Sequence, residues 1–255
     1  MQVEGSVFLV TGGASGLGAA TARMIVRNSG SVLIADLNES EGQNLASELG
    51  SNARFVRTDV TSEASTQAAV KEAVNSFGKL NGVVCCAGIA PGEKVLNKGE
   101  CHNLENFTNC MMVNLVGTFN PARLGAKAIS ETIANEEGER GIIIFTASVA
   151  AFEGQIGQAA YSASKAGLVG MTLPMARELA RYGIRVMTIA PGIFETPMLK
   201  GLPVEVQDSL GQMVPFPSRL GRGDEYGQLV KSICENSMLN GEVIRLDGAI
   251  RMASK

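Results

Sequence analysis

A tyrosine and a lysine four residues apart have the types and spacing needed for proton transfer. In the stretch Tyr161-Ser-Ala-Ser-Lys165 the two side chains would lie on one face of a helix, one above the other. A phenol has a pKa of about 10, and a cation nearby favours the phenolate and lowers that pKa. The pair predicts a general base for a substrate hydroxyl, although a buried amphipathic pair would share the spacing.

Two further polar residues lie where the same chemistry would need them. Ser148 follows the apolar run 142–147, and ligands of open α/β sheets bind at the carboxyl ends of strands. Its hydroxyl could hydrogen-bond the substrate oxygen as charge develops there. Asn114 lies inside a helical pattern, where asparagine is mildly unfavourable. We interpret its side chain as a bridge, through water, to Lys165.

A glycine-rich turn near the amino end predicts a phosphate-binding site. The stretch Thr11-Gly-Gly-Ala-Ser-Gly-Leu-Gly18 separates a strand-like run from a helical pattern. Glycine permits positive φ and a close approach of backbone to ligand. A helix N-terminus adds unpaired N–H groups for a pyrophosphate. The spacing G-x-x-x-G-x-G is a relative of the dinucleotide fingerprint. A plain tight turn is the alternative.

Two aspartates follow the second and third strand-like runs. Asp36 would accept hydrogen bonds from the adenosine ribose and repel a 2′-phosphate. No arginine neighbours it, which favours NAD over NADP. Asp59, with Val60, could hold the adenine amino group. Either aspartate could instead cap the helix that follows it.

These residues need a framework, and the chain alternates apolar β-branched runs with amphipathic helical stretches. Strands are expected at 7–10, 32–35, 54–57, 82–85, 141–145, 184–189 and 242–246. Near-continuous apolar runs are typical of parallel strands covered on both faces. We therefore predict an α/β fold, a doubly wound Rossmann-type parallel sheet of about seven strands with helices on both faces. Residues 1–255 form one domain in this interpretation, and the proline-rich segment 191–223 is an irregular substrate loop.

Composition excludes several other classes of function. The net charge is −3, with 22 basic and 25 acidic residues and no basic cluster, so no nucleic-acid partner is expected. No apolar run is long enough for a membrane helix. The five cysteines form no C-x-x-C pair and favour a reducing compartment. His102, the one histidine, is interpreted as a surface residue, and no metal site is expected.

Taken in order along the chain, these motifs resemble those of the short-chain dehydrogenase/reductase family. The resemblance covers essentially the whole chain and includes Pro191-Gly192 with Thr196. It implies that Asn114, Ser148, Tyr161 and Lys165 form a catalytic tetrad. The motifs and the resemblance assign the cofactor to Gly12, Ser15, Gly16, Leu17, Gly18, Asp36, Asp59, Val60, Cys86, Ala87, Gly88, Tyr161, Lys165, Phe194 and Thr196. They assign the substrate to Ser148, Gln155 and Tyr161.

Within that family, the stretches 146–161, 170–174, 214–221 and 239–252 are most similar to enzymes of L-3-hydroxyacyl-CoA oxidation. The resemblance implies such a CoA ester, including 2-methyl-branched ones, as substrate, NAD as cofactor and a homotetramer. The resemblance alone would suggest the mitochondrial matrix, where the similar animal enzymes occur, but no basic leader precedes the first strand, so we expect a bacterial cytoplasm first and the mitochondrial matrix second. Cys85-Cys86 departs from the family's usual Asn-Asn. The apolar residues Ile193, Phe194, Met198, Leu199 and Leu202 equally allow a hydroxysteroid or another secondary alcohol, and an NAD-binding scaffold without turnover is the third hypothesis.

Overall fold

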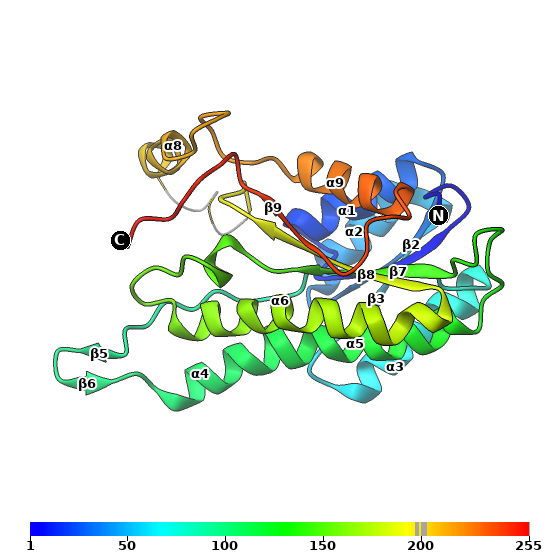
Figure 1. The fold of residues 1–255 in the computed structure, drawn as a ribbon, viewed down its shortest axis with the longest axis horizontal. Coiled ribbons are helices and arrows are strands. Elements are labelled where there is room, and N and C mark those ends of the chain that lie inside the picture. The colour runs from blue at the N-terminus through cyan, green and yellow to red at the C-terminus, as the bar shows by residue number, and fades with distance from the viewer. Residues whose placement is uncertain (197–198, 200–202, 255) are drawn as a thin grey trace.

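A parallel sheet of seven strands forms the centre of the computed structural model, which describes residues 1–196, 199 and 203–254 (Figure 1). In sheet order the strands are β3 (Ala53–Arg57), β2 (Ser31–Asp36), β1 (Val7–Thr11), β4 (Gly82–Cys85), β7 (Gly141–Thr146), β8 (Ile184–Pro191) and β9 (Val243–Leu246). Each strand pairs with its neighbours in parallel. The predicted fold class and all seven predicted strands are confirmed.

The strand order reverses between β1 and β4. From β1 the chain builds outward to β2 and β3, and then returns to place β4 on the other side of β1. Thr11 at the end of β1 is paired with Cys85 at the end of β4. In doubly wound sheets, ligands bind in the crevice outside the carboxyl ends of the strands at such a reversal.

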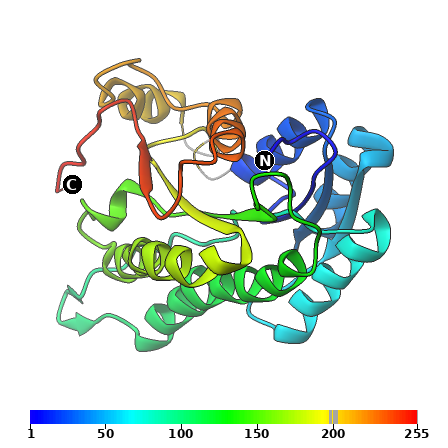
Figure 2. The same cartoon turned by 45° about the vertical axis from the view of Figure 1, so that its right-hand side comes forward.

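Helices cover both faces of the sheet (Figures 1 and 2). One face carries α1 (Gly16–Arg27), α2 (Glu39–Leu49) and α9 (Gly223–Glu235), and the other carries α3 (Glu63–Phe77), α4 (Leu104–Met111), α5 (Gly117–Ser130) and α6 (Ala159–Leu179). Short 3-10 turns span Gly50–Asn52, Val149–Ala151 and Ala180–Tyr182. None of the helices in the described ranges is long and apolar enough to cross a membrane.

The strand side chains divide between two apolar cores. In β1, Phe8 and Val10 pack into the core beneath α1 and α9, whereas Val7 and Leu9 pack into the core beneath α3, α5 and α6. All four are buried, and burying such a side chain stabilises the fold by roughly 1.5–3 kcal/mol. An apolar residue is therefore needed at every position, which explains the unbroken runs in the sequence.

Asparagine and serine define where several helices begin. Asn38 accepts a hydrogen bond from the Glu41 amide at the start of α2, and Ser62 does the same for Ser65 at the start of α3. Asn103 caps α4. Side-chain oxygens at this position satisfy amides that have no partner within the helix. The beginnings of α2 and α3 lie just after β2 and β3, so these caps fix the loops that follow the strand ends.

Three features differ from the sequence expectations. The segment 191–223 is not wholly irregular, because it contains helix α8 (Val204–Gln212). A small hairpin, β5 (Leu96–Asn97) and β6 (Glu100–Cys101), projects from the same end of the molecule (Figure 1). Finally, His102, predicted to be a surface residue, is partly buried: its side chain is 13% exposed and lies 3.7 Å from the Glu93 carboxylate.

Arg185 provides a test of the packing of β8 against α9. Its guanidinium donates to Oε1 of Glu139 at 2.8 Å and to the backbone oxygens of Ile233 and Cys234, and both charged side chains are 7% exposed. We expect Arg185→Met to destabilise the fold by about 3 kcal/mol, because the buried backbone oxygens of Ile233 and Cys234 lose their donor and the Glu139 carboxylate keeps one of its two cationic partners, the Met1 ammonium. The measurement is thermal unfolding at fixed protein concentration. The control is Arg27→Met, at a pair whose arginine is 64% exposed, and an equal loss in both variants would contradict this account.

Candidate active site

A cleft of about 680 Å³ opens at the carboxyl ends of the central strands. Ser148 and Gln155 line it, as does every residue predicted to bind the cofactor: Gly12, Ser15, Gly16, Leu17, Gly18, Asp36, Asp59, Val60, Cys86, Ala87, Gly88, Tyr161, Lys165, Phe194 and Thr196. Residues from the whole length of the chain therefore meet at the reversal of strand order. Two residues of the expected substrate loop, Met198 and Leu202, lie outside the described residues.

In the glycine-rich turn, the backbone at two glycines lies very close to the backbone of neighbouring residues. Gly12 has a φ of +62°, and a β-carbon there would lie 2.5 Å from the Ala87 amide nitrogen. A β-carbon on Gly18 would lie 2.1 Å from the Gly12 carbonyl oxygen. Ser15 precedes α1 and makes no side-chain cap. The first turn of α1 therefore presents its amides, with the positive end of the helix dipole, to the cleft.

The two aspartates are held by local backbone rather than used as helix caps. Asp36 accepts from the Ala14 amide through Oδ2 and from the Asn38 amide through Oδ1, both at 3.0 Å. Asp59 accepts from the amide and the hydroxyl of Thr61. The caps of the following helices are Asn38 and Ser62. The capping alternative is thus removed for both aspartates, and both line the cleft.

Tyr161 and Lys165 face the cleft from the first turns of α6. The Lys165 ammonium lies 5.7 Å from the centroid of the Tyr161 ring and donates to the Thr146 carbonyl oxygen at 2.8 Å. Burial lowers the pKa of Lys165 to about 8. The ammonium is therefore mostly charged at neutral pH.

The direction predicted for the Tyr161 pKa is wrong for the protein chain alone. Burial raises the pKa of Tyr161, and a hydrogen bond with Ser148 lowers it by less. The Lys165 ammonium lies 5.7 Å from the centroid of the Tyr161 ring, and its charge does not offset the rise in the Tyr161 pKa that burial of the phenol causes. The phenol of this chain is therefore protonated near neutral pH, with Ser148 as the group that favours its ionisation.

Asn114 lies behind the cleft and does not line it. It occupies a π-helical turn, Met112–Val116, and is fully buried. Its amide group accepts from the Ile89 amide and donates to the Ile89 oxygen, both at 2.8 Å, and also donates to Ser164 at 3.0 Å. A β-carbon on Gly88 would lie within 3.4 Å of both Asn114 and the Lys165 ammonium. Asn114 thus fixes the segment after β4 beside the ammonium.

Some residues of the site were not found from the sequence. Tyr226 of α9 is fully buried, and its hydroxyl lies 2.7 Å from the Thr146 hydroxyl and 3.8 Å from the Cys86 sulfur. Met252, close to the carboxyl end, lines the cleft. No spacing links either residue to the motifs, because they lie 65 or more positions beyond Tyr161 in sequence. Only the tertiary fold brings them to the site.

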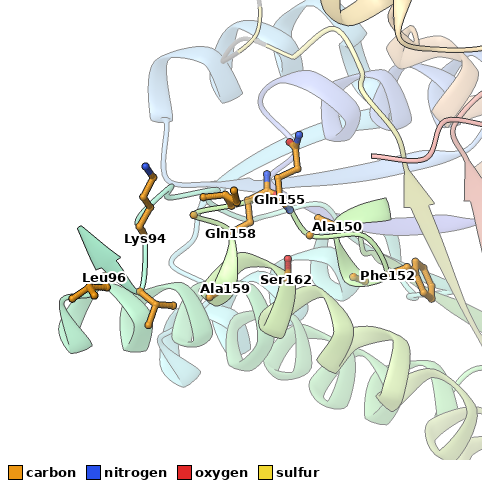
Figure 3. A pocket seen from close by; sticks show the side chains of 13 residues that line it. Lys94, Leu96, Ala150, Phe152, Gln155, Gln158, Ala159 and Ser162 are labelled. Atoms are coloured by element: carbon orange, nitrogen blue, oxygen red, sulfur yellow. The ribbon is translucent and has the colours of Figure 1, made fainter. Parts of the chain in front are cut away.

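A second hollow of about 600 Å³ adjoins the cleft (Figure 3). Gln155 and Gln158 line both spaces. Figure 3 shows these two side chains above Ser162 of α6, with Lys94 at the left of the view. The loop between β7 and α6 is therefore a wall shared by the two spaces.

Comparison with known proteins gives consistent results. Residues 6–206 match the short chain dehydrogenase family. The chain is 56% identical over 253 residues to the 3-hydroxyacyl-CoA dehydrogenase type-2 of Homo sapiens, covering 98% of this chain and 97% of that protein. It is 54% identical over 253 residues to the Drosophila melanogaster protein of the same name, covering 98% and 99%.

A solved structure agrees as well. The crystal structure of 3-hydroxyacyl-CoA dehydrogenase type-2 from Mycobacterium avium superimposes with a TM-score of 0.93 at 42% identity, over 98% of this chain and 97% of that one. The motifs, the parallel sheet and these likenesses lead to one conclusion. The chain belongs to the short-chain dehydrogenase family of oxidoreductases, as its sequence motifs predict.

Proposed function

We propose that this protein oxidises L-3-hydroxyacyl-CoA, including 2-methyl-branched esters, to 3-ketoacyl-CoA with NAD as the hydride acceptor. The observation that carries the proposal is the arrangement of Ser148, Tyr161 and Lys165 at one end of a cleft that also holds the glycine-rich turn. The names and high identity of the relatives support the choice of CoA ester.

The cleft fits a dinucleotide. Its volume is about 680 Å³, and the close backbone contacts of Gly12 and Gly18 leave room for a pyrophosphate beside α1. Asp36 would hold the adenosine ribose, and the next two residues are the uncharged Leu37 and Asn38. A carboxylate without a basic neighbour supports NAD rather than NADP. Phe194 and Thr196 would hold the nicotinamide end.

In this mechanism the protein positions the alcohol and moves its proton. NAD supplies the hydride acceptor. Ser148 hydrogen-bonds the substrate oxygen, and the same hydroxyl favours the Tyr161 phenolate. As a phenolate, which the positive charge of bound NAD would favour, Tyr161 would take the hydroxyl proton as the carbinol carbon is oxidised. Lys165 contributes a buried positive charge beside the phenol. Its ammonium also has N–H groups that can donate to a hydroxyl.

A second candidate keeps the chemistry and changes the substrate. Phe194, Leu199, Leu210 and Met252 give the cleft an apolar wall, which suits a hydroxysteroid or another bulky secondary alcohol. A scaffold without turnover is the least supported candidate, because it would need neither Ser148 nor Tyr161.

We also propose that the protein is a homotetramer in a reducing compartment, a bacterial cytoplasm ahead of a mitochondrial matrix. Five free cysteines support the compartment, and the assembly rests on the resemblance of the sequence to the family. Light scattering coupled to size-exclusion chromatography tests the assembly directly.

Substrate choice is tested by reduction with NADH of acetoacetyl-CoA, a ketosteroid and a simple ketone. We expect the CoA ester to have the highest kcat/KM.

The role of Tyr161 is tested by Tyr161→Phe. Turnover should fall by a factor of about 10²–10⁴ because the group that donates and accepts the proton is lost, while NADH binding, measured by fluorescence, is retained. The control is Tyr182→Phe, at a tyrosine that is 39% exposed and stacked on Arg181. Full activity of Tyr161→Phe would remove this residue from its role.

The pH profile of oxidation should depend on Ser148. Its hydrogen bond lowers the pKa of Tyr161, so Ser148→Ala should raise the apparent pKa of the rising limb and move it to higher pH. The measurement is kcat/KM from pH 6 to 10, with Ser76→Ala on the exposed side of α3 as control. A lower rate with an unmoved limb would limit Ser148 to substrate binding.

Cofactor choice should depend on the charge of Asp36. Asp36→Asn keeps an acceptor for the Ala14 amide and removes the repulsion of a 2′-phosphate. Two negative charges about 4 Å apart repel by roughly 4 kcal/mol near a protein surface. The ratio of kcat/KM for NAD over NADP should therefore fall at least about tenfold. Glu41→Gln on the exposed face of α2 is the matched control, and an unchanged ratio in Asp36→Asn would contradict the assignment.

A further inference from the structure

The carboxyl-terminal segment 250–254 returns to the active site after β9. In Figure 1 this segment is drawn in red and ends at the same end of the molecule as α8 and the β5–β6 hairpin. Its backbone follows the loop between β7 and α6. The Met252 amide donates to Oε2 of Glu153 at 3.0 Å, and the Ser254 oxygen accepts from the Ile156 amide at 3.0 Å. Between them, the Gln155 amide group donates to the Ala253 oxygen at 3.2 Å.

Glu153 binds residues on both sides of the contact between the segment 250–254 and the loop that precedes α6. Its carboxylate accepts from the Arg245 guanidinium at 2.8 and 3.2 Å and lies 3.3 Å from that of Arg251. Arg245 also donates to Asp247 and to the Ile250 oxygen. These contacts tie β9, the segment 250–254 and the loop that begins at Ser148 into one unit. The hydrogen bond with Arg245 lowers the pKa of Glu153, so its charge persists at neutral pH.

The loop that receives the segment is the one that runs from Ser148 to Tyr161. Gln155, halfway along it, lines the cleft and binds the residue after Met252. Met252 itself lines the cleft. Its side chain is partly buried, and methionine is an apolar, adaptable surface for a ligand. The substrate end of the cleft therefore has a wall that comes from the last residues of the chain.

We propose that Met252 is a specificity-determining residue that contacts the acyl part of the substrate, and that Glu153 and Arg245 are positioning residues that hold it there. The inference rests on the proposed function for the substrate class. It assigns to the segment 250–254 a role in discriminating straight from 2-methyl-branched acyl groups, since Met252 lines the same cleft as Ser148 and Tyr161.

The size of residue 252 is the first test. We expect Met252→Ala to raise the ratio of kcat/KM for 2-methylacetoacetyl-CoA over acetoacetyl-CoA by about tenfold, within the range that one methyl-sized space provides. Met252→Phe should lower that ratio. Met238→Ala, at a methionine that is 91% exposed, should leave it unchanged. An unchanged ratio in both Met252 variants would overturn the inference.

A double-mutant cycle tests the positioning role. Glu153→Gln should shift the ratio in the same direction as Met252→Ala and raise KM for the CoA ester, with NADH affinity retained. In the Met252→Ala background, Glu153→Gln should shift the ratio no further, because Glu153 acts through Met252. An equal shift in both backgrounds would overturn that role. A wild-type enzyme inactive on both esters would instead reject the proposed function itself.

Discussion

The burial of one ammonium group constrains the rest of the site. Lys165 is 5% exposed, and a buried charge is costly unless it is hydrogen-bonded. The partner that the structure provides is the carbonyl oxygen at the end of β7, so the helix that carries the lysine and the strand that carries the carbonyl must meet at a fixed distance. The cost of burial is also visible in the low pKa of this lysine, about 8. At neutral pH the group nevertheless stays mostly charged.

The other end of the cleft is built mainly from backbone. Gly12 and Gly18 approach neighbouring backbone so closely that no side chain fits, and Asp36 is tied to the same turn through Ala14. The cleft thus combines a rigid backbone cradle for a cofactor with a side-chain cluster for proton transfer. The two parts come from opposite sides of the reversal in strand order, which is why a single sheet can hold both.

The sequence was sufficient for the sheet and for the residues around the cleft, because both depend on local signals. Seven apolar runs predict seven strands, and the glycine, Ser148 and Tyr161–Lys165 motifs lie at strand ends or on one helix face. Interactions between distant parts of the chain were not predictable. The Tyr161 pKa depends on how much of the fold buries the phenol, and Met252 reaches the site through contacts of its segment with Glu153, Gln155 and Ile156. Helix α8 was missed because prolines on both sides conceal its pattern.

The hydrogen bond between Tyr226 and Thr146 joins residues 80 positions apart. The carbonyl oxygen of Thr146 also accepts the hydrogen bond of Lys165. Helix α9 therefore supports the proton-transfer site, although it carries neither the glycine-rich motif nor the Tyr–Lys pair. The nucleotide motif and the Tyr–Lys pair are complete by residue 165, yet their support is made only after residue 226 has been synthesised. During translation, competence for chemistry therefore comes only after α9 has left the ribosome, later than the motifs themselves.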